Sequence, residues 1–272
     1  MISVLMSAYN SEKTLKRAID SILCGSYRDL ELILLDDGSS DNTAEIIREA
    51  AEKDSRCVVL KNEKNQGLTK SLNTCLSAAR GEFIARMDAD DFSHPDRLEK
   101  QLGFLASHPE YAFVCSAANL KEDGKIYGKR QYMPRPEKKD LASRCVFIQP
   151  TLLIRAEAIK SVGGYLDKSY TTRCEDYDLY FRLYKNGFIG YNMEEALIDY
   201  EEKRGDVSKH TPKTRLNEFC VRIRGAAALK NFSGFIKAFK SILLIFVPKR
   251  VYLWLKNKRS ENIIYDENST QS

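Results

Sequence analysis

The sequence predicts an α/β fold in which helices flank a Rossmann-like, mostly parallel central sheet. Two observations predict this class. In the first half of the chain, short apolar runs alternate with amphipathic stretches, as expected when helices cross over between parallel strands buried on both faces. A polar or glycine-containing turn also follows each apolar run. With 272 residues, 43% of them hydrophobic, the chain can bury a core, and one large domain with an extension is expected.

The apolar runs are expected to form strands and the stretches between them helices. Ser11 is the expected N-cap of the first helix and Asp41 that of the second, because such side chains accept hydrogen bonds from the first helical turn. The expected strands are residues 2–7, 30–35, 57–61, 83–87, 111–116 and 151–154, with a β-hairpin around residues 121–125. Further helices are expected at residues 68–79 and from Cys174 to about Asn186.

Four polar clusters are expected to meet at one edge of this sheet. In an open parallel sheet, ligands bind outside the carboxyl ends of the strands, where several loops come together. Each of the first four expected strands is followed by such a cluster, so this edge is the expected ligand site. The clusters are Ala8-Tyr9-Asn10, Asp36-Asp37-Gly38-Ser39-Ser40-Asp41, Asn65-Gln66-Gly67 and Asp88-Ala89-Asp90-Asp91.

The cluster Asp88-Ala89-Asp90-Asp91 is a candidate metal site. A buried strand delivers three carboxylates into one cleft, where their like charges repel unless a divalent cation lies between them. Oxygen ligands favour Mg²⁺ or Mn²⁺, which can bridge to a diphosphate and neutralise the charge of a leaving group. The alternative is an acidic N-cap cluster before a helix near Pro95.

Two further carboxylate motifs have a chemical and a structural interpretation. Asp36 and Asp37 could accept hydrogen bonds from a base N–H or a ribose hydroxyl of a nucleotide. Alternatively, the motif could only form the turn at Gly38 and cap the next helix. Asp176, at the start of an amphipathic helix, could be a general base for an acceptor hydroxyl. Alternatively, it could only stabilise the helix through the macrodipole.

The basic character of the chain lies in its C-terminal part. From Phe219 onward the chain has ten Lys and Arg and three Asp and Glu. Residues 1–218 have 33 Lys and Arg and 35 Asp and Glu. We divide the chain into residues 1–218, with halves at 1–117 and 118–218, a basic amphipathic helical extension at 219–260, and a disordered tail at 261–272. Residues 229–260 have eight Lys and Arg, no acidic residue and many aromatic residues. This composition favours binding to an anionic membrane surface. Packing on the first domain or on a second subunit is the alternative.

Cysteine usage and the N-terminus indicate a cytoplasmic protein. The seven cysteines are odd in number and scattered, which predicts neither a disulfide framework nor a zinc site and fits a reducing compartment. The first apolar run is too short for a secretory signal or a membrane span. The longest apolar run of the extension, residues 242–247, is also too short to span a bilayer.

Over residues 1–205, the chain resembles family 2 glycosyltransferases. The resemblance rests on five motifs in the family's order, and the late segment from Glu201 to Ser208 is similar to the family's closing loop. The stretch Ile148-Gln149-Pro150-Thr151, before Arg155, departs from many relatives, which have a histidine at the position of Gln149. The motifs are residues 4–10, 34–43, 65–67, 87–91 and 174–179.

The resemblance implies a GT-A fold and an inverting transfer from a nucleotide-diphosphate sugar. Asp90 would bind Mn²⁺ or Mg²⁺, and Asp176 would be the general base. Apart from the resemblance, the position of Asp91 leads us to expect that it only caps a helix. One base suffices, because a metal-bound diphosphate leaves without protonation. The expected nucleotide-sugar contacts are Ala8, Tyr9, Asn10, Asp36, Asp37, Gly67, Asp88 and, at the diphosphate, Arg204.

Two rival functions stay open. A nucleotidyltransferase also combines such a sheet with metal-binding aspartates, but it needs a glycine-rich basic phosphate loop that residues 7–13 do not provide. A non-catalytic membrane-associated scaffold would keep the fold without the activity. The favoured hypothesis is polysaccharide or glycan synthesis at the inner face of the cell membrane, with a UDP-sugar donor and a glycan or lipid-linked acceptor. We expect no nucleic-acid partner, and a homo-oligomer is possible.

Overall fold

The computed structural model describes residues 1–204, 211–245, 247 and 263–265. The strands are β1 (Ile2–Ala8), β2 (Leu30–Asp36), β3 (Cys57–Lys61), β4 (Phe83–Arg86), β5 (Phe92–Ser93), β6 (Phe113–Glu122), β7 (Lys125–Arg130), β8 (Leu153–Arg155), β9 (Gly190–Glu201) and β10 (Ile263–Tyr265). The helices are α1 (Leu15–Leu23), α2 (Thr43–Lys53), α3 (Leu68–Ala78), α4 (Arg97–Ser107), α5 (Lys138–Leu141), α6 (Ala156–Ser161), α7 (Glu175–Lys185), α8 (Pro212–Ala228) and α9 (Phe232–Leu243).

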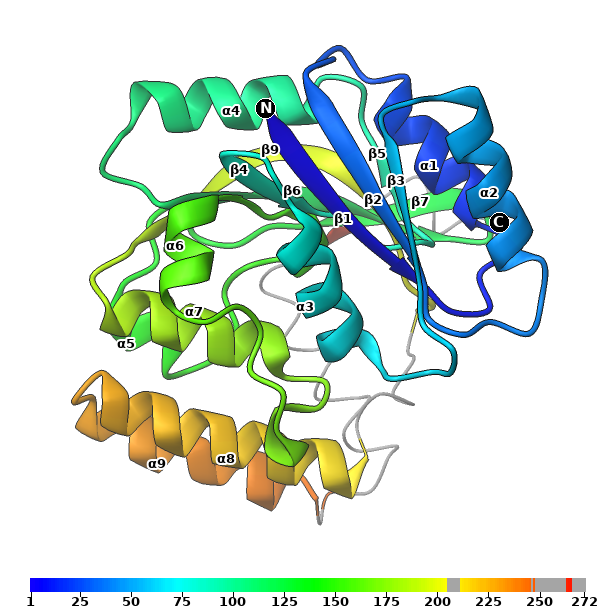
Figure 1. Cartoon of the computed structure of the whole chain (residues 1–272). Helices are drawn as coiled ribbons and strands as arrows, with labels where there is room; N and C mark the ends of the chain where they lie inside the picture. The colour runs from blue at the N-terminus through cyan, green and yellow to red at the C-terminus, as the bar shows by residue number, and fades with distance from the viewer. Residues whose placement is uncertain (205–210, 246, 248–262, 266–272) are drawn as a thin grey trace.

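The architecture is α/β, as predicted. The sheet has the order β10-β7-β6-β8-β4-β1-β2-β3, and β9 pairs with β5 and β6. Strands β4, β1, β2 and β3 are parallel neighbours, whereas β8 lies antiparallel between β4 and β6. Helices cover both faces of the sheet, and α8 and α9 form a further layer beneath α7 (Figure 1).

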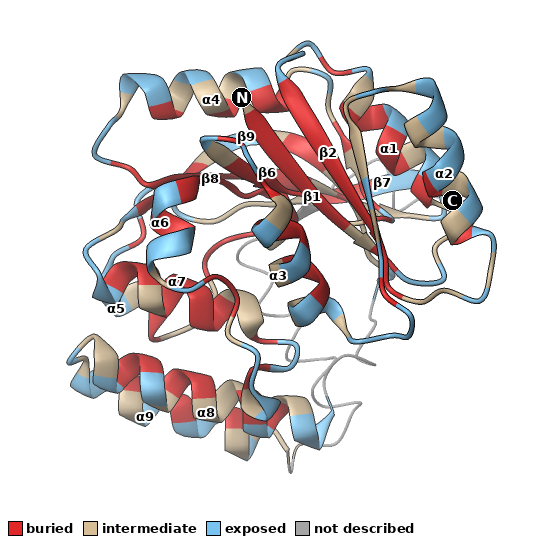
Figure 2. Ribbon diagram, in the orientation of Figure 1, coloured by how far each residue is buried: buried red, intermediate tan, exposed pale blue. Residues whose placement is uncertain are grey.

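Side chains of β1 and β2 alternate between two hydrophobic cores, one on each face of the sheet. Leu5 packs in one core with α3, α6 and α7, and the neighbouring Val4 packs in the other with α1, α2 and α4. This explains the unbroken apolar runs, because both faces of these strands are buried (Figure 2). Parallel pairing sets Ala8 opposite Asp36, so the two strands end together.

The first two helices begin later than predicted. Their N-cap residues are Thr14 and Asn42, so the expectation of Ser11 and Asp41 as N-caps was wrong. The reason is that the turn before α1 and the turn before α2 form hydrogen bonds with each other, and each helix begins only after these bonds. The Ser11 N–H donates to Thr43 Oγ1 at 2.7 Å, and an Asp41 oxygen accepts a backbone N–H from the β1–α1 turn at 3.1 Å.

The predicted boundaries cut through continuous elements. The boundary at 117/118 falls inside β6, which pairs with β9 along its length, and the boundary at 218/219 falls inside α8. The expected disordered tail is wrong for residues 263–265, which form β10 on β7; Ile, Ile and Tyr suit a strand, and β7 offers a free edge. Residues 246, 248–262 and 266–272, which include most of the predicted extension and tail, lie outside the described residues. Within the described part, no helix is long and apolar enough to cross a bilayer.

Candidate active site

The loops after β1 and β2 are joined by hydrogen bonds at the carboxyl edge of the sheet. The backbone N–H of Asn10, a residue with φ of +49°, donates to Ser39 Oγ at 3.0 Å. Its Oδ1 accepts the backbone N–H of Ser40 at 2.9 Å. Ala8 is buried and the Tyr9 side chain is 48% exposed. The structure thus brings the predicted contacts Ala8, Tyr9 and Asn10 to the expected edge.

Asp36 and Asp37 are both buried, but their carboxylates differ in what they contact. Asp36 Oδ1 accepts a backbone N–H at 2.9 Å, and its buried Oδ2 has no hydrogen-bond partner among the described residues. Asp37 Oδ1 accepts hydrogen bonds from Asn62 Nδ2 at 2.7 Å and the Gln66 N–H at 2.9 Å. Its Oδ2 accepts the Gly67 N–H at 2.9 Å. Asp36 therefore has an oxygen available for a ligand, whereas Asp37 and Gly67 fix the loop before α3.

Replacing Asp37 should destabilise the fold. In Asp37→Asn, an amide nitrogen takes the place of one oxygen and faces a backbone donor, which leaves that donor unpaired at a cost of about 1–3 kcal/mol. Thermal unfolding should show a midpoint lower by about 2–10 °C. Asp123→Asn, in an exposed turn, is the matched control and should leave the midpoint unchanged. Equal midpoints for both variants would contradict the role assigned to Asp37.

Asp88, Asp90 and Asp91 form an acidic cluster directly after β4. One carboxylate oxygen from each lies within 4.8 Å of those from the other two. Asp91 is fully buried; its Oδ1 accepts the Glu201 N–H at 3.0 Å, and its Oδ2 has no partner among the described residues. Burial, and then the charges of Asp88 and Asp90, raise the pKa of Asp91 well above its ordinary value. This set of hard oxygen donors fits Mn²⁺ or Mg²⁺.

The expectation that Asp91 only caps a helix was wrong. The next helix, α4, begins at Arg97, and Asp96 is its N-cap residue. Asp91 instead holds the end of β9 through the bond from Glu201 and adds a third carboxylate to the cluster.

Arg86 is a buried cation that the sequence analysis missed. Its guanidinium pairs with the Asp88 carboxylate, and its Nε and Nη1 have no hydrogen-bond partner among the described residues. Burial opposes the charge of Arg86, but Asp88, Tyr165 and Glu175 together hold its pKa above the ordinary value. An arginine in an otherwise apolar strand was the available signal. Arg86 therefore connects the acidic cluster electrostatically with the start of α7.

Asp176 lies at the start of α7 and lines a cavity of about 310 Å³. The cavity lies between α7, α8 and the turn before α7, and Arg173 in that turn has a φ of +63°. Arg215 and Glu218 of α8, which pair at 3.1 Å, form the opposite wall. The predicted base therefore faces a space on the side of the molecule that was expected to hold the acceptor.

The carboxylates of Glu175 and Asp176 titrate above their ordinary range. Burial raises the pKa of Asp176, and the nearby Asp88 carboxylate adds to this, whereas the Tyr177 N–H and the Arg86 charge oppose it. Burial and the Asp176 charge raise the pKa of Glu175 to about 7. Asp88 and Arg86 act on both carboxylates, which places the donor-side cluster and the predicted base in one electrostatic site.

Removing the Glu175 carboxyl should leave the acid limb of activity in place. A general base acts only when ionised, so activity is lost as the pH falls through the raised pKa of Asp176. Burial and the Asp176 charge raise the pKa of Glu175 to about 7, so Asp176 ionises first and Glu175 is neutral while Asp176 titrates. In Glu175→Gln a neutral amide replaces a neutral carboxyl, and the acid limb of kcat/KM against pH should move by less than about half a pH unit. A limb that moves by a full unit would contradict this order of ionisation.

Gln149 joins two buried tyrosines near this site. Its Nε2 donates to Tyr165 Oη at 2.8 Å, and its Oε1 accepts the Tyr180 hydroxyl at 2.6 Å. The residue that departs from the family pattern therefore has a packing role in this chain. Tyr165 in turn lies close enough to Arg86 to be coupled to its charge.

Arg204 contacts the β6–β7 hairpin. Its Nε lies 3.2 Å from a Glu122 oxygen, and its guanidinium stacks over the Tyr127 ring at 4.9 Å. Its role at a diphosphate stays a prediction. The rest of the predicted closing loop, residues 205–208, lies outside the described residues.

The fold is the GT-A fold, as two solved structures show. The structure of Staphylococcus aureus TarS 1-349 in complex with UDP-GlcNAc superposes with a TM-score of 0.70 at 18% identity, covering 94% of this chain and 78% of that one. The mannosyltransferase PcManGT from Pyrobaculum calidifontis, in complex with GDP-Man and Mn²⁺, gives a TM-score of 0.63 at 17% identity, covering 96% and 87%.

The chain belongs to glycosyl transferase family 2, whose family model matches residues 3–163. It is 36% identical over 263 residues to the "Putative glycosyltransferase EpsE" of Bacillus subtilis (strain 168), covering 96% of this chain and 95% of that protein. It is 28% identical to the Escherichia coli UDP-Glc:alpha-D-GlcNAc-diphosphoundecaprenol beta-1,3-glucosyltransferase WfaP, covering 90% and 91%. The protein is therefore a glycosyltransferase.

Proposed function

We propose that the protein is an inverting glycosyltransferase that moves a sugar from a UDP-sugar to an acceptor hydroxyl in polysaccharide or glycan synthesis. The observation that carries the proposal is the single electrostatic site that joins Asp88, Arg86 and Asp176. A single displacement needs a diphosphate site on one side of the sugar and a base on the other. The UDP-GlcNAc complex of TarS and the UDP-Glc in the name of WfaP support the nucleotide.

The donor side has a distinct role for each residue. The exposed ring of Tyr9 offers a face for the nucleotide base, with Ala8 beside it. The Asp36 oxygen that has no partner within the described part of the chain accepts a base N–H or a ribose hydroxyl. Asp88, oriented by Arg86, contacts the ribose or the sugar. Asn10, Asp37 and Gly67 hold the surrounding loops.

Asp90, with Asp88 and Asp91, would hold Mn²⁺ or Mg²⁺. A cation there is supported by the buried Asp91 oxygen, which no described residue contacts through a hydrogen bond, and by the raised pKa of the Asp91 carboxyl. When bound, the cation would neutralise the negative charge of the leaving diphosphate. The Mn²⁺ in the PcManGT complex supports a divalent metal.

Asp176 takes the proton from the acceptor hydroxyl. As the hydroxyl oxygen bonds to the anomeric carbon, the bond to the diphosphate oxygen breaks, and the proton passes to the carboxylate. The raised pKa makes Asp176 a stronger base than an exposed aspartate, and the Arg86 charge favours its ionised form. The cavity of about 310 Å³ beside Asp176 receives the acceptor sugar.

The enzyme works on the cytoplasmic face of a membrane, to which residues 229–260 bind peripherally. The eight Lys and Arg of this segment, with no acid among them, support contact with an anionic surface. A glycan or lipid-linked acceptor would be within reach of an enzyme held there, and the diphosphoundecaprenol in the name of WfaP supports such an acceptor.

A donor screen tests the proposed function. The purified protein should release nucleoside diphosphate slowly from one nucleotide sugar, with Mn²⁺ or Mg²⁺ and not with EDTA. A matching nucleoside diphosphate and metal should raise the unfolding temperature. Pyrophosphate release from a nucleoside triphosphate and a sugar phosphate would favour a nucleotidyltransferase. The absence of any response across the donors would favour a scaffold.

A further inference from the structure

Helix α9 exposes four of its six large apolar side chains and buries three small residues. Gly234, Ala238 and Ser241 form the buried face. The exposed face carries four large apolar side chains at helical spacing, which we call the α9 stripe. Its members are Phe232, Ile236, Phe239 and Leu243, which are 79%, 67%, 55% and 66% exposed. An apolar stripe of this kind marks an interaction surface.

Close packing fixes this orientation. A Cβ atom on Gly234 would lie 2.8 Å from Ala142 Cβ and 2.9 Å from Ala226 Cβ, so the inner face of α9 accepts only a small residue there. At the N-terminus of α9, the Asn231 side chain accepts the Gly234 N–H at 3.1 Å. Helix α9 cannot rotate to bury the stripe without losing these contacts.

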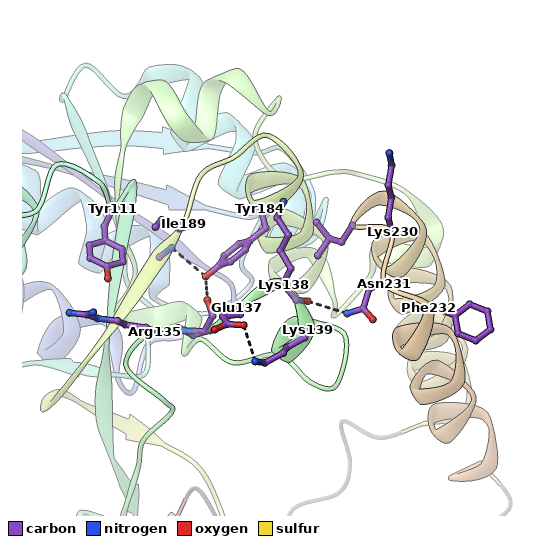
Figure 3. Close-up of a pocket in the computed structure, with 13 residues that line it drawn as sticks. Tyr111, Arg135, Glu137, Lys138, Lys139, Tyr184, Ile189, Lys230, Asn231 and Phe232 are labelled. Atoms are coloured by element: carbon purple, nitrogen blue, oxygen red, sulfur yellow. Dashed lines mark hydrogen bonds and ion pairs between the residues drawn. The ribbon is translucent and has the colours of Figure 1, made fainter.

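A cavity of about 730 Å³ adjoins the first residue of the stripe (Figure 3). Three cations line it from two sides: Arg135 and Lys138 from the segment before and in α5, and Lys230 from the α8–α9 turn. Among the residues that the structure describes, none of the three forms an ion pair. Phe232 lies at its rim, and Figure 3 shows its ring directed away from the other lining side chains.

The cavity is partly preorganised. The side chain of Asn231 donates to the Lys138 backbone oxygen at 3.5 Å, which connects the two walls. Tyr184 at its base donates its hydroxyl to the Pro136 carbonyl at 2.8 Å. A fourth cation, Lys139, pairs with Glu137 at 2.9 Å. Among the described lining residues, Glu137 is the one acid.

The charge of this region selects an anionic occupant. In the described residues 211–245, Lys and Arg outnumber acids by seven to one, and the acid, Glu218, already pairs with Arg215 and Arg222. A second copy docked on the stripe would bring two basic surfaces together, which costs free energy. A bilayer with anionic lipids instead offers an apolar interior to the stripe and phosphates to the cations.

We propose that the cavity at the α8–α9 turn binds the phosphate of an anionic lipid headgroup while the α9 stripe lies in the bilayer interface. This deepens the proposed membrane contact and rests on it. An amphipathic helix at a membrane surface sinks its apolar face about 5–10 Å into the boundary between headgroups and acyl chains. Because Phe232 belongs to both the stripe and the cavity rim, insertion of the stripe brings the cavity to the headgroups. Phosphate would accept hydrogen bonds from Arg135, Lys138 and Lys230.

Vesicle co-sedimentation of the full chain tests the proposal, with neutral phosphatidylcholine vesicles and vesicles that contain phosphatidylglycerol. Lys138→Gln with Lys230→Gln should weaken binding to the anionic vesicles about 30-fold, the effect expected for two lysines at such a surface. The control pair, Lys53→Gln with Lys125→Gln, removes the same charge from α2 and the β6–β7 hairpin and should change binding no more than about threefold. Inorganic phosphate at millimolar concentration should not compete.

Three results would separate the possible failures. Equal binding by the cavity pair and the control pair would overturn the headgroup site, as would competition by inorganic phosphate, which would assign the cavity to a soluble anion. Ile236→Ser with Phe239→Ser should reduce binding to both kinds of vesicle. If that pair binds like the unaltered chain, the proposed membrane contact itself fails. Unfolding temperatures of all variants within about 2 °C of the unaltered chain will establish that they fold.

Discussion

Asp176→Asn should abolish sugar transfer while leaving donor binding intact. An amide cannot accept the acceptor proton, and loss of a positioned general base lowers kcat by about 10²- to 10⁴-fold. The donor contacts lie at the carboxyl edges of β1, β2 and β4, so the Kd for the nucleotide sugar and metal should change no more than about twofold. Rapid-quench turnover and titration calorimetry on the same preparation measure the two quantities.

Asp167→Asn is the matched control for this variant. Asp167 is an exposed carboxylate that lies 4.0 Å from Lys70, and it lines no part of the cavity beside Asp176. It should keep full turnover. Unchanged kcat in Asp176→Asn would remove Asp176 from the mechanism, and loss of donor binding would assign it to the donor site.

Asp90→Asn should make the enzyme dependent on far more metal. An amide oxygen is a weaker and neutral ligand, and the cluster loses one of its three carboxylates. We expect the Mn²⁺ concentration for half-maximal activity to rise at least about tenfold and kcat to fall at least about a hundredfold, because metal neutralisation of a leaving group contributes several kcal/mol. Turnover measured against metal concentration gives both values.

Asp96→Asn provides the comparison. Asp96 pairs with Lys100 at 2.6 Å on the outside of α4, only a few residues beyond the cluster. Its replacement should leave the metal dependence unchanged. If Asp90→Asn also had an unchanged metal dependence, the cluster would be a purely structural feature of the β4–β5 turn.

The donor half of the fold could be predicted because its physical signals are local. Strands buried on both faces give continuous apolar runs, and parallel pairing places the residues after them at one edge. This is why the clusters beginning at Ala8, Asp36 and Asp88 were found. The division of roles between Asp36 and Asp37 could not be predicted, since it depends on hydrogen bonds from Asn62 and Gly67 far along the chain.

The features of the site and of α9 that the sequence did not predict arise from packing between residues far apart in the chain. Arg86 looked like one polar position in an apolar strand, and its role follows from the approach of Asp88 and Glu175 in three dimensions. The burial of Asp91 depends on β9, more than a hundred residues later. Helix α9 has an ordinary amphipathic composition, and only its packing through Gly234 reveals which face is outside.

The most direct test of the central claim is the configuration of the sugar released when the enzyme hydrolyses its donor. Water takes the place of the acceptor, so the acceptor need not be known, and proton NMR distinguishes the two anomers before they equilibrate. With Mn²⁺ or Mg²⁺ and an α-linked UDP-sugar, a single displacement assisted by Asp176 releases the β anomer first. Early release of the α anomer, or hydrolysis that proceeds equally with EDTA, would contradict the account.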